Sequence, residues 1–187
     1  MRPELAVLLL ALAPTALSLA IGAPSAAAGL GLGRPPTPRE IAAWDIDVRA
    51  DGRGLPAGRG DVAQGREIYA RKCQACHGAG GQGGLVEPLV GGQGSLASAH
   101  PVRTVGSYWP YATTLFDYVR RAMPFDAPQS LSADEVYALS AYILFQNGVV
   151  PAGAVMDARS LPKVRMPNRG GFITSDPRPD TGPPARR

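Results

Sequence analysis

Two cysteines and a histidine stand together in the run Cys73-Gln74-Ala75-Cys76-His77. On a helical turn, cysteines at positions i and i+3 project from the same side, where both thiols can add to the two vinyl groups of a haem. The adjacent His77 would then place its imidazole on the iron. The pattern therefore predicts one covalently attached c-type haem, held by Cys73 and Cys76, with His77 as an axial ligand.

The same residues allow three other interpretations. A redox-active C-x-x-C disulfide would need a strand–helix–strand context, which the sequence does not show. A zinc site needs four ligands, and Cys73, Cys76, His77 and His100 would be just enough to supply them. A chance match is the third alternative.

The second axial ligand must come from the opposite side of the haem. Met123 follows a predicted helix and precedes Pro124, which would stiffen the loop that presents the sulfur. Methionine ligation raises the reduction potential relative to two histidines, so Met123 would favour an electron acceptor, whereas the rival ligand His100 would lower the potential. A six-coordinate iron also leaves no position for a substrate. Met156 and Met166 fall in an expected extended tail.

Four further residues are weaker candidates for contacts around the haem. The Pro88 carbonyl can accept the hydrogen bond of the second His77 nitrogen, although a turn proline is equally consistent with this position. Trp109 has an indole N–H that can reach a haem propionate, or it packs in the core. Arg120 and Arg121 can neutralise propionates or bind a partner, but cations also suit the carboxyl end of a helix.

Three helices and no confident strand are predicted to position these residues. Capping patterns at Asp61/Gln64 and Ser132/Glu135 begin helices that end near residues 76 and 148. Between them, residues 111–121 show helical apolar spacing before a proline. This spacing puts four side chains on one stripe, Leu115, Tyr118, Val119 and Ala122.

The packing of these elements is also indicated by small and aromatic residues. Gly65 and Tyr69 on the first helix, with Tyr142 on the last, suit a close helix crossing. The stretch 78–94 is too rich in glycine for a regular element, so we expect it to wrap around a bound group.

The amino-terminal residues have the features of an export signal. Arg2 precedes an apolar run over residues 5–21, and the small residues 26–28 form a plausible cleavage site before Gly29. An uncleaved membrane anchor is the alternative, because no charge occurs from residue 5 to residue 33. Residues 1–28 are therefore a predicted signal peptide, and we expect a periplasmic protein that does not attach to a membrane unless the signal is retained.

Composition divides the rest of the chain into a compact domain and two flanks. Residues 29–60 and 151–187 each contain 11 Gly or Pro, so we expect extended flanks around a mainly α-helical domain at 61–150. The net charge of +4 belongs to the tail, where residues 151–187 carry seven Lys or Arg against three acids. The compact part shows no basic, aromatic-rich face, which argues against nucleic-acid binding.

The C-x-x-C-H helix, the later Met-Pro pair and the closing amphipathic helix resemble a class I cytochrome c domain, a small helical fold around one haem. Further segments resemble, more specifically, the cytochrome subunit of the bacterial sulfane dehydrogenase of the Sox system and the related sulfite dehydrogenase cytochromes. These segments are 44–48, 54–56, 105–115, 120–124 and 161–168. The resemblance extends over residues 40–180.

This resemblance implies an electron-transfer subunit of an oxidoreductase complex rather than a catalyst in its own right. In that family the cytochrome partners a molybdenum-cofactor subunit that oxidises sulfur compounds, and it passes electrons onward to a downstream cytochrome or oxidase. The family's haem residues correspond to Cys73, Cys76, His77 and Met123. Well-known members are longer and carry a second haem domain, whereas this chain has one C-x-x-C-H motif and so one haem.

Two other functions fit the same cofactor. A free periplasmic cytochrome that shuttles electrons between respiratory complexes would need the haem core but no dedicated tails. A catalytic haem protein would need an open iron position, which Met123 would close. In a subunit of a complex, residues 40–60 and 151–180 would wrap the molybdenum subunit and become ordered on binding, whereas in a free shuttle they would merely cover the haem domain.

Overall fold

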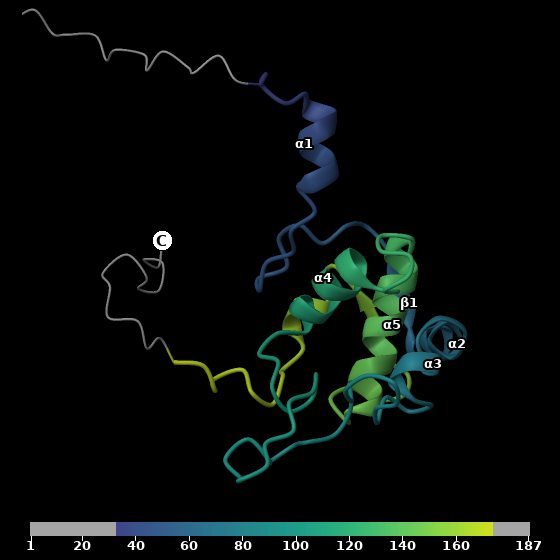
Figure 1. The fold of residues 1–187 in the computed structure, drawn as a ribbon, viewed down its shortest axis with the longest axis vertical. Helices are drawn as coiled ribbons and strands as arrows, with labels where there is room; N and C mark the ends of the chain where they lie inside the picture. Colours follow the sequence, from purple (N-terminus) through teal and green to yellow (C-terminus); the bar gives the residue numbers. More distant parts are fainter. Residues whose placement is uncertain (1–32, 174–187) are drawn as a thin grey trace, which may run out of the picture. The chain divides into compact units, whose positions relative to one another are not determined.

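The computed structural model describes residues 33–173, which form a mainly helical domain. Its elements, in chain order, are α1 (Pro38–Trp44), β1 (Arg59–Asp61), α2 (Val62–Lys72), α3 (Gln74–His77), α4 (Ala112–Ala122), α5 (Ala133–Gln146), β2 (Val155–Asp157) and the 3-10 helix η1 (Leu161–Lys163) (Figure 1). The predicted signal peptide lies outside the described residues. Within residues 33–173, no helix combines the length and the hydropathy needed to cross a membrane.

Helices α2 and α5 begin at the two predicted capping boxes. The Asp61 carboxylate accepts the Gln64 amide at 2.8 Å, and the Gln64 side chain accepts the Asp61 amide at 3.1 Å. At the start of α5, the Ser132 hydroxyl accepts the Glu135 amide at 3.3 Å, and the Glu135 carboxylate accepts the Ser132 amide at 2.9 Å. These bonds satisfy backbone donors that have no partner inside the helix, so the local sequence determines where both helices start.

Helices α2 and α5 cross at the predicted place (Figure 1). A Cβ atom added to Gly65 would lie 2.6 Å from the carbonyl carbon of Ala138 and 2.7 Å from the Cβ atom of Tyr142. The Tyr69 and Tyr142 rings pack with their centroids 5.2 Å apart. Only glycine lets the two backbones approach this closely, so the predicted close crossing is confirmed.

Helix α4 completes the core and ends directly before Met123. Leu115 and Phe116 are buried, as is Val119, whereas Tyr118 remains half exposed. Phe116 stacks at a tilt on the buried Tyr137 of α5, with ring centroids 4.5 Å apart. Packing against α5 therefore fixes the helix whose last residue precedes the predicted second ligand.

The flanks depart from the extended conformation that their composition suggests. β1 and β2 pair in an antiparallel sheet with Gly60 opposite Met156, which joins the two flanks to each other. Met156 and Met166 are 5% and 4% exposed, and Leu161 is fully buried. Proline and glycine limit helix and sheet formation but do not prevent apolar side chains between them from packing into a core, so the compact part of the chain extends on both sides of the predicted 61–150.

Candidate haem site

The C-x-x-C-H motif lies on a short turn of its own. Helix α2 ends at Lys72, and Cys73, with φ of −127°, separates it from α3. The Cys73 carbonyl accepts the amides of Cys76 at 3.2 Å and His77 at 3.0 Å. The helix predicted to continue to about residue 76 is therefore interrupted at the first cysteine, and the motif keeps the helical turn that places both thiols on one side.

Both cysteines are free thiols in different surroundings. Cys73 is half-buried against the core, and burial raises the pKa of its thiol to about 11. Cys76 is exposed. Within residues 33–173, no group of three or more His, Cys, Asp or Glu side chains is arranged to hold a metal ion, so the zinc alternative with His100 as the fourth ligand has no support.

The His77 imidazole is not fixed by a hydrogen bond in this structure. Its Nδ1 atom is buried and has no hydrogen-bond partner. A buried polar atom without a partner is costly, and in a haem protein the ring nitrogen that does not bind iron usually donates a hydrogen bond that fixes the imidazole. The predicted bond to the Pro88 carbonyl is not formed in this structure. Iron bound to Nε2 would orient the imidazole ring. The hydrogen bond from Nδ1 to the Pro88 carbonyl stays a prediction for the haem-bound protein.

The glycine-rich loop closes over the motif. The His77 carbonyl accepts the Gly83 amide at 3.1 Å, and the Cys76 carbonyl accepts the Val86 amide at 3.3 Å. Gly78, with φ of +80°, is required here because a side chain would collide with the Gly83 carbonyl oxygen. Leu85, in this loop, is 83% exposed. An exposed apolar side chain in the loop that closes over the motif suits contact with an apolar macrocycle.

Asn147 holds this loop to the end of α5. It is 8% exposed; its Nδ2 donates to the carbonyls of Leu89 at 3.2 Å and Ile143 at 2.9 Å, while its Oδ1 accepts the Gly91 amide at 3.2 Å. Its own carbonyl accepts Gln93 Nε2 at 3.1 Å. Sequence reasoning missed this residue. An asparagine directly before the predicted helix-ending glycine was the available signal, because asparagine side chains commonly bond to nearby backbone.

Met123 lies directly after α4, as the sequence predicted. It is half-buried there, and its amide donates to the Val119 carbonyl at 3.1 Å. Met156 and Met166 are buried in the core rather than extended in a tail. His100 lies exposed in a loop. The ligation of iron by Met123 stays a prediction.

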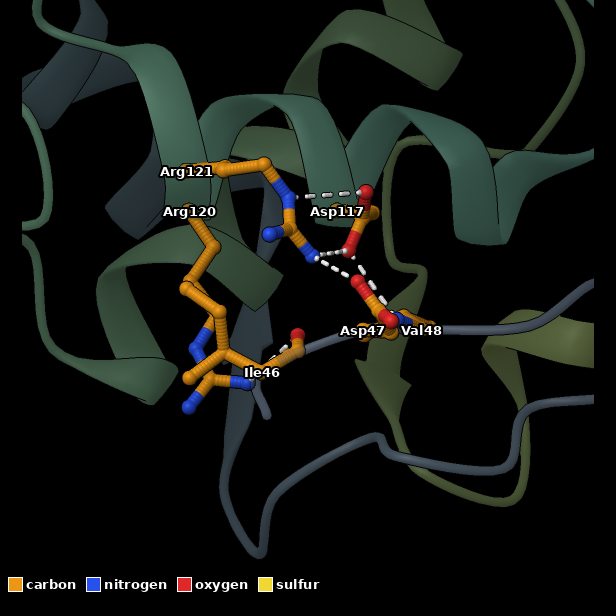
Figure 2. Close-up of polar contacts among 6 residues, drawn as sticks. All are labelled: Ile46, Asp47, Val48, Asp117, Arg120 and Arg121. Atoms are coloured by element: carbon orange, nitrogen blue, oxygen red, sulfur yellow. Dashed lines mark hydrogen bonds and ion pairs between the residues drawn. The ribbon is translucent and has the colours of Figure 1, made fainter. Parts of the chain in front are cut away.

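The aromatic candidate and the two cationic candidates have identifiable neighbours. Trp109 is half-buried and meets the Tyr118 ring edge-on, with centroids 5.8 Å apart. Its contact with a propionate stays a prediction. Arg120 donates to the Ile46 carbonyl at 3.4 Å, and Arg121 pairs with Asp117 and with Asp47 (Figure 2). Hydrogen bonding to Asp117 raises the pKa of the Arg121 guanidinium. Both arginines therefore contact the amino-terminal flank.

Comparison with solved structures identifies the family. The sulfane dehydrogenase SoxCD from Paracoccus pantotrophus is 47% identical in sequence and superposes with a TM-score of 0.74; the match covers 79% of this chain and 73% of that chain. The protein belongs to the family of the SoxCD cytochrome subunit. It is a c-type cytochrome with the class I fold, as its motifs predicted.

Two further comparisons agree with this family. Residues 60–143 match the family described as cytochrome c oxidase, cbb3-type, subunit III. The thiosulfate dehydrogenase of Stutzerimonas stutzeri (strain A1501) is 31% identical over 96 residues. That match covers 47% of this SoxCD-related cytochrome and 28% of the thiosulfate dehydrogenase. The chain therefore spans less than a third of the length of the thiosulfate dehydrogenase. The residues that match the family, 60–143, include the predicted haem motif at 73–77. Together, the three comparisons support a role in electron transfer during sulfur oxidation.

Proposed function

We propose that this protein is a periplasmic monohaem cytochrome c that accepts electrons from the molybdenum-cofactor subunit of a sulfane or sulfite dehydrogenase. It passes them to a downstream cytochrome or oxidase. The observation that carries this proposal is the C-x-x-C-H turn in a chain 47% identical to SoxCD. Haem, when bound, supplies reversible one-electron reduction.

The residues of the chain attach, ligate and shield that group. Cys73 and Cys76 would form the thioether bonds to haem, and His77 and Met123 would ligate its iron. The one C-x-x-C-H motif in this sequence would hold one haem, which carries one electron at a time. With two ligands from the protein, the iron would offer no position to a substrate, which separates this function from that of a haem catalyst.

A surface for the partner subunit is available on α1. This helix begins at a complete capping box formed by Thr37 and Glu40, yet it buries none of its residues. Ile41 is 50% exposed and Trp44 is 84% exposed. Parts of both flanks pack on the haem domain itself, so we place the contact with the molybdenum subunit on α1 rather than along the whole of both flanks. Exposed tryptophan is enriched where proteins bind one another.

The first experiment measures the ratio of molybdenum to haem after gentle purification from the native periplasm, and tests reduction by sulfite and by thiosulfate. About one molybdenum per haem, with haem reduced by a sulfur compound, is the expected result for a one-to-one complex. Haem without molybdenum, unreduced by either compound, would contradict the proposal and leave the free electron shuttle. Recovery of the protein in the cytoplasmic fraction would contradict the proposed location.

The docking surface is tested by co-purification. Trp44→Ala should reduce recovery of the molybdenum subunit while leaving the haem spectrum unchanged. Ile173→Ala is the matched control, because Ile173 is 88% exposed and lies outside α1. An intact complex in Trp44→Ala would rule out α1 as the docking surface without affecting the haem assignment.

Covalent attachment is tested by denaturing electrophoresis with haem staining. The wild-type band should keep its haem after boiling in detergent, and a variant with both Cys73→Ala and Cys76→Ala should lose it. Haem retained by the double variant would contradict thioether attachment.

A further inference from the structure

Three charged side chains join the amino-terminal flank to the last turn of α4. Arg121 Nη2 donates to Asp47 Oδ1 at 2.7 Å and to Asp117 Oδ1 at 3.0 Å, and Arg121 Nε donates to Asp117 Oδ2 at 3.3 Å. The Val48 amide donates to Asp117 Oδ1 at 3.0 Å (Figure 2). We call Asp47, Asp117 and Arg121 the α4 clamp. It connects residues separated by about 70 positions in the sequence.

The clamp acts on the turn that leads directly into Met123. Arg121 lies two residues before Met123, and Arg120 fastens the same turn to the Ile46 carbonyl at 3.4 Å. On the other side of the helix, Val119 is buried in the core. The last turn of a helix is the part that frays first, because its carbonyls lack intrahelical partners. The clamp therefore fixes the segment from which the Met123 side chain extends.

The clamp contributes little to overall stability. The side chain of Asp47 is 76% exposed, and that of Arg121 is 36% exposed. Ion pairs of this exposure are screened by water and salt and have small effects on the free energy of unfolding. A change in Met123 can therefore be separated experimentally from a general loss of the fold.

We propose that the α4 clamp is a positioning device for the Met123 thioether, which holds the sulfur at the iron and so keeps the reduction potential high. The inference rests on the proposed ligation of iron by Met123. Asp47, Asp117 and Arg121 do not touch the haem themselves; they restrain the backbone on which the ligand is mounted.

The test uses the haem-loaded full-length protein and three single variants, Asp47→Asn, Asp117→Asn and Arg121→Gln. The measurements are the ferric methionine-to-iron charge-transfer band, the reduction potential and the affinity for imidazole, which competes with Met123 for the iron. Arg53→Gln is the matched control, since it breaks the exposed ion pair with Asp51 on the same flank without touching α4. Met123→Ala marks complete loss of the ligand.

Each clamp variant should bind imidazole about fivefold more tightly than wild type, the effect expected for losing one exposed charged contact. The charge-transfer band should weaken and the potential should fall toward that of Met123→Ala, while Arg53→Gln stays at the wild-type values. Asp47→Asn is the clamp variant expected to fold like the wild type, because the Asp47 side chain lies on the surface. It keeps the test valid if another clamp variant fails to fold.

Two results would overturn the proposal in distinguishable ways. Clamp variants that match Arg53→Gln in all three measurements would show that the clamp does not position Met123. If Met123→Ala left the charge-transfer band and the reduction potential unchanged, Met123 would not be the iron ligand, and the inference would lose its basis. Neither result would bear on the partner of the cytochrome, because the molybdenum-to-haem ratio tests that part of the proposed function independently.

Discussion

Replacement of Gly65 by alanine tests the helix crossing that carries the haem-binding turn. Gly65 lies in α2, one helix before the cysteines, and faces the backbone of Ala138 in α5. In an exposed helix, this substitution stabilises a protein by up to about 1 kcal/mol, because alanine has a much higher helix propensity than glycine. At the crossing, the added methyl group should have the opposite effect.

The structure gives the size of the conflict. The new Cβ atom would lie 2.6 Å from the carbonyl carbon of Ala138, whereas ordinary contacts of this kind begin at 3.4 Å. The Ala138 carbonyl oxygen would lie closer still, so the helices must separate by more than this difference, and backbone atoms cannot turn aside as the end of a side chain can. Overpacking of this kind costs about 3 kcal/mol, so after the gain in propensity we expect a net loss of about 2 kcal/mol in the free energy of unfolding.

The assay is guanidinium unfolding of the haem-loaded protein, followed by far-ultraviolet circular dichroism. A loss of this size corresponds to a decrease of about 8 °C in Tm for a domain of this length. Gly153→Ala is the control, because no atom lies within 4 Å of its added Cβ. If Gly65→Ala were as stable as the wild type while the control behaved normally, the close approach of α2 and α5 would be refuted.

Three other substitutions test separate parts of the structure. Asn147→Ala should lower the free energy of unfolding by about 3 kcal/mol, because it leaves the Leu89 carbonyl and the Gly91 amide without their partner; an unchanged urea midpoint would contradict this role. Tyr137→Phe removes the hydroxyl that donates to the Pro56 carbonyl at 2.8 Å and should cost about 1 kcal/mol in the same assay, with no effect expected on the haem spectrum. The Ser132 amide, together with Lys72, lowers the pKa of Glu135 below its ordinary value of 4.5. The charged carboxylate therefore stabilises the fold above that pH, and this contribution is lost as the pH falls through the lowered pKa. Glu135→Gln should flatten the acid side of the curve of stability against pH, and a wild-type slope would argue against the contribution.

The features that could be predicted from the sequence depend on residues close together along the chain. Capping boxes within four residues predicted the starts of α2 and α5, and the C-x-x-C-H motif gave the turn that α3 forms. Gly65 and Tyr69 predicted the helix crossing, because a glycine and an aromatic residue on one face leave few other ways to pack. Helical periodicity was less reliable on α4, where it grouped Tyr118 with the buried side chains although this residue stays half exposed.

The features that were missed depend on contacts between distant parts of the chain. Nothing in the local sequence indicates that Asp47 meets Arg121, or that Gly60 lies opposite Met156. High proline and glycine content suggested extended flanks, but composition does not reveal where the apolar side chains of a flank find a core. Leu161 and Met166 are buried because the fold leaves room for them, and that room is created by residues elsewhere in the chain.

The pairing of β1 with β2 also has a consequence for the order in which the protein is made. Gly60 must wait for Met156 to be synthesised, nearly a hundred residues later, before the two strands can form. Cys73 and Cys76 are translated long before that point. Pairing over such a distance is slow, because the chain must close a long loop first. In the exported protein that we propose, an amino-terminus-first passage through the membrane would bring both thiols to the periplasm before Met156, so haem attachment would have a period in which to precede the final packing of the carboxyl-terminal flank.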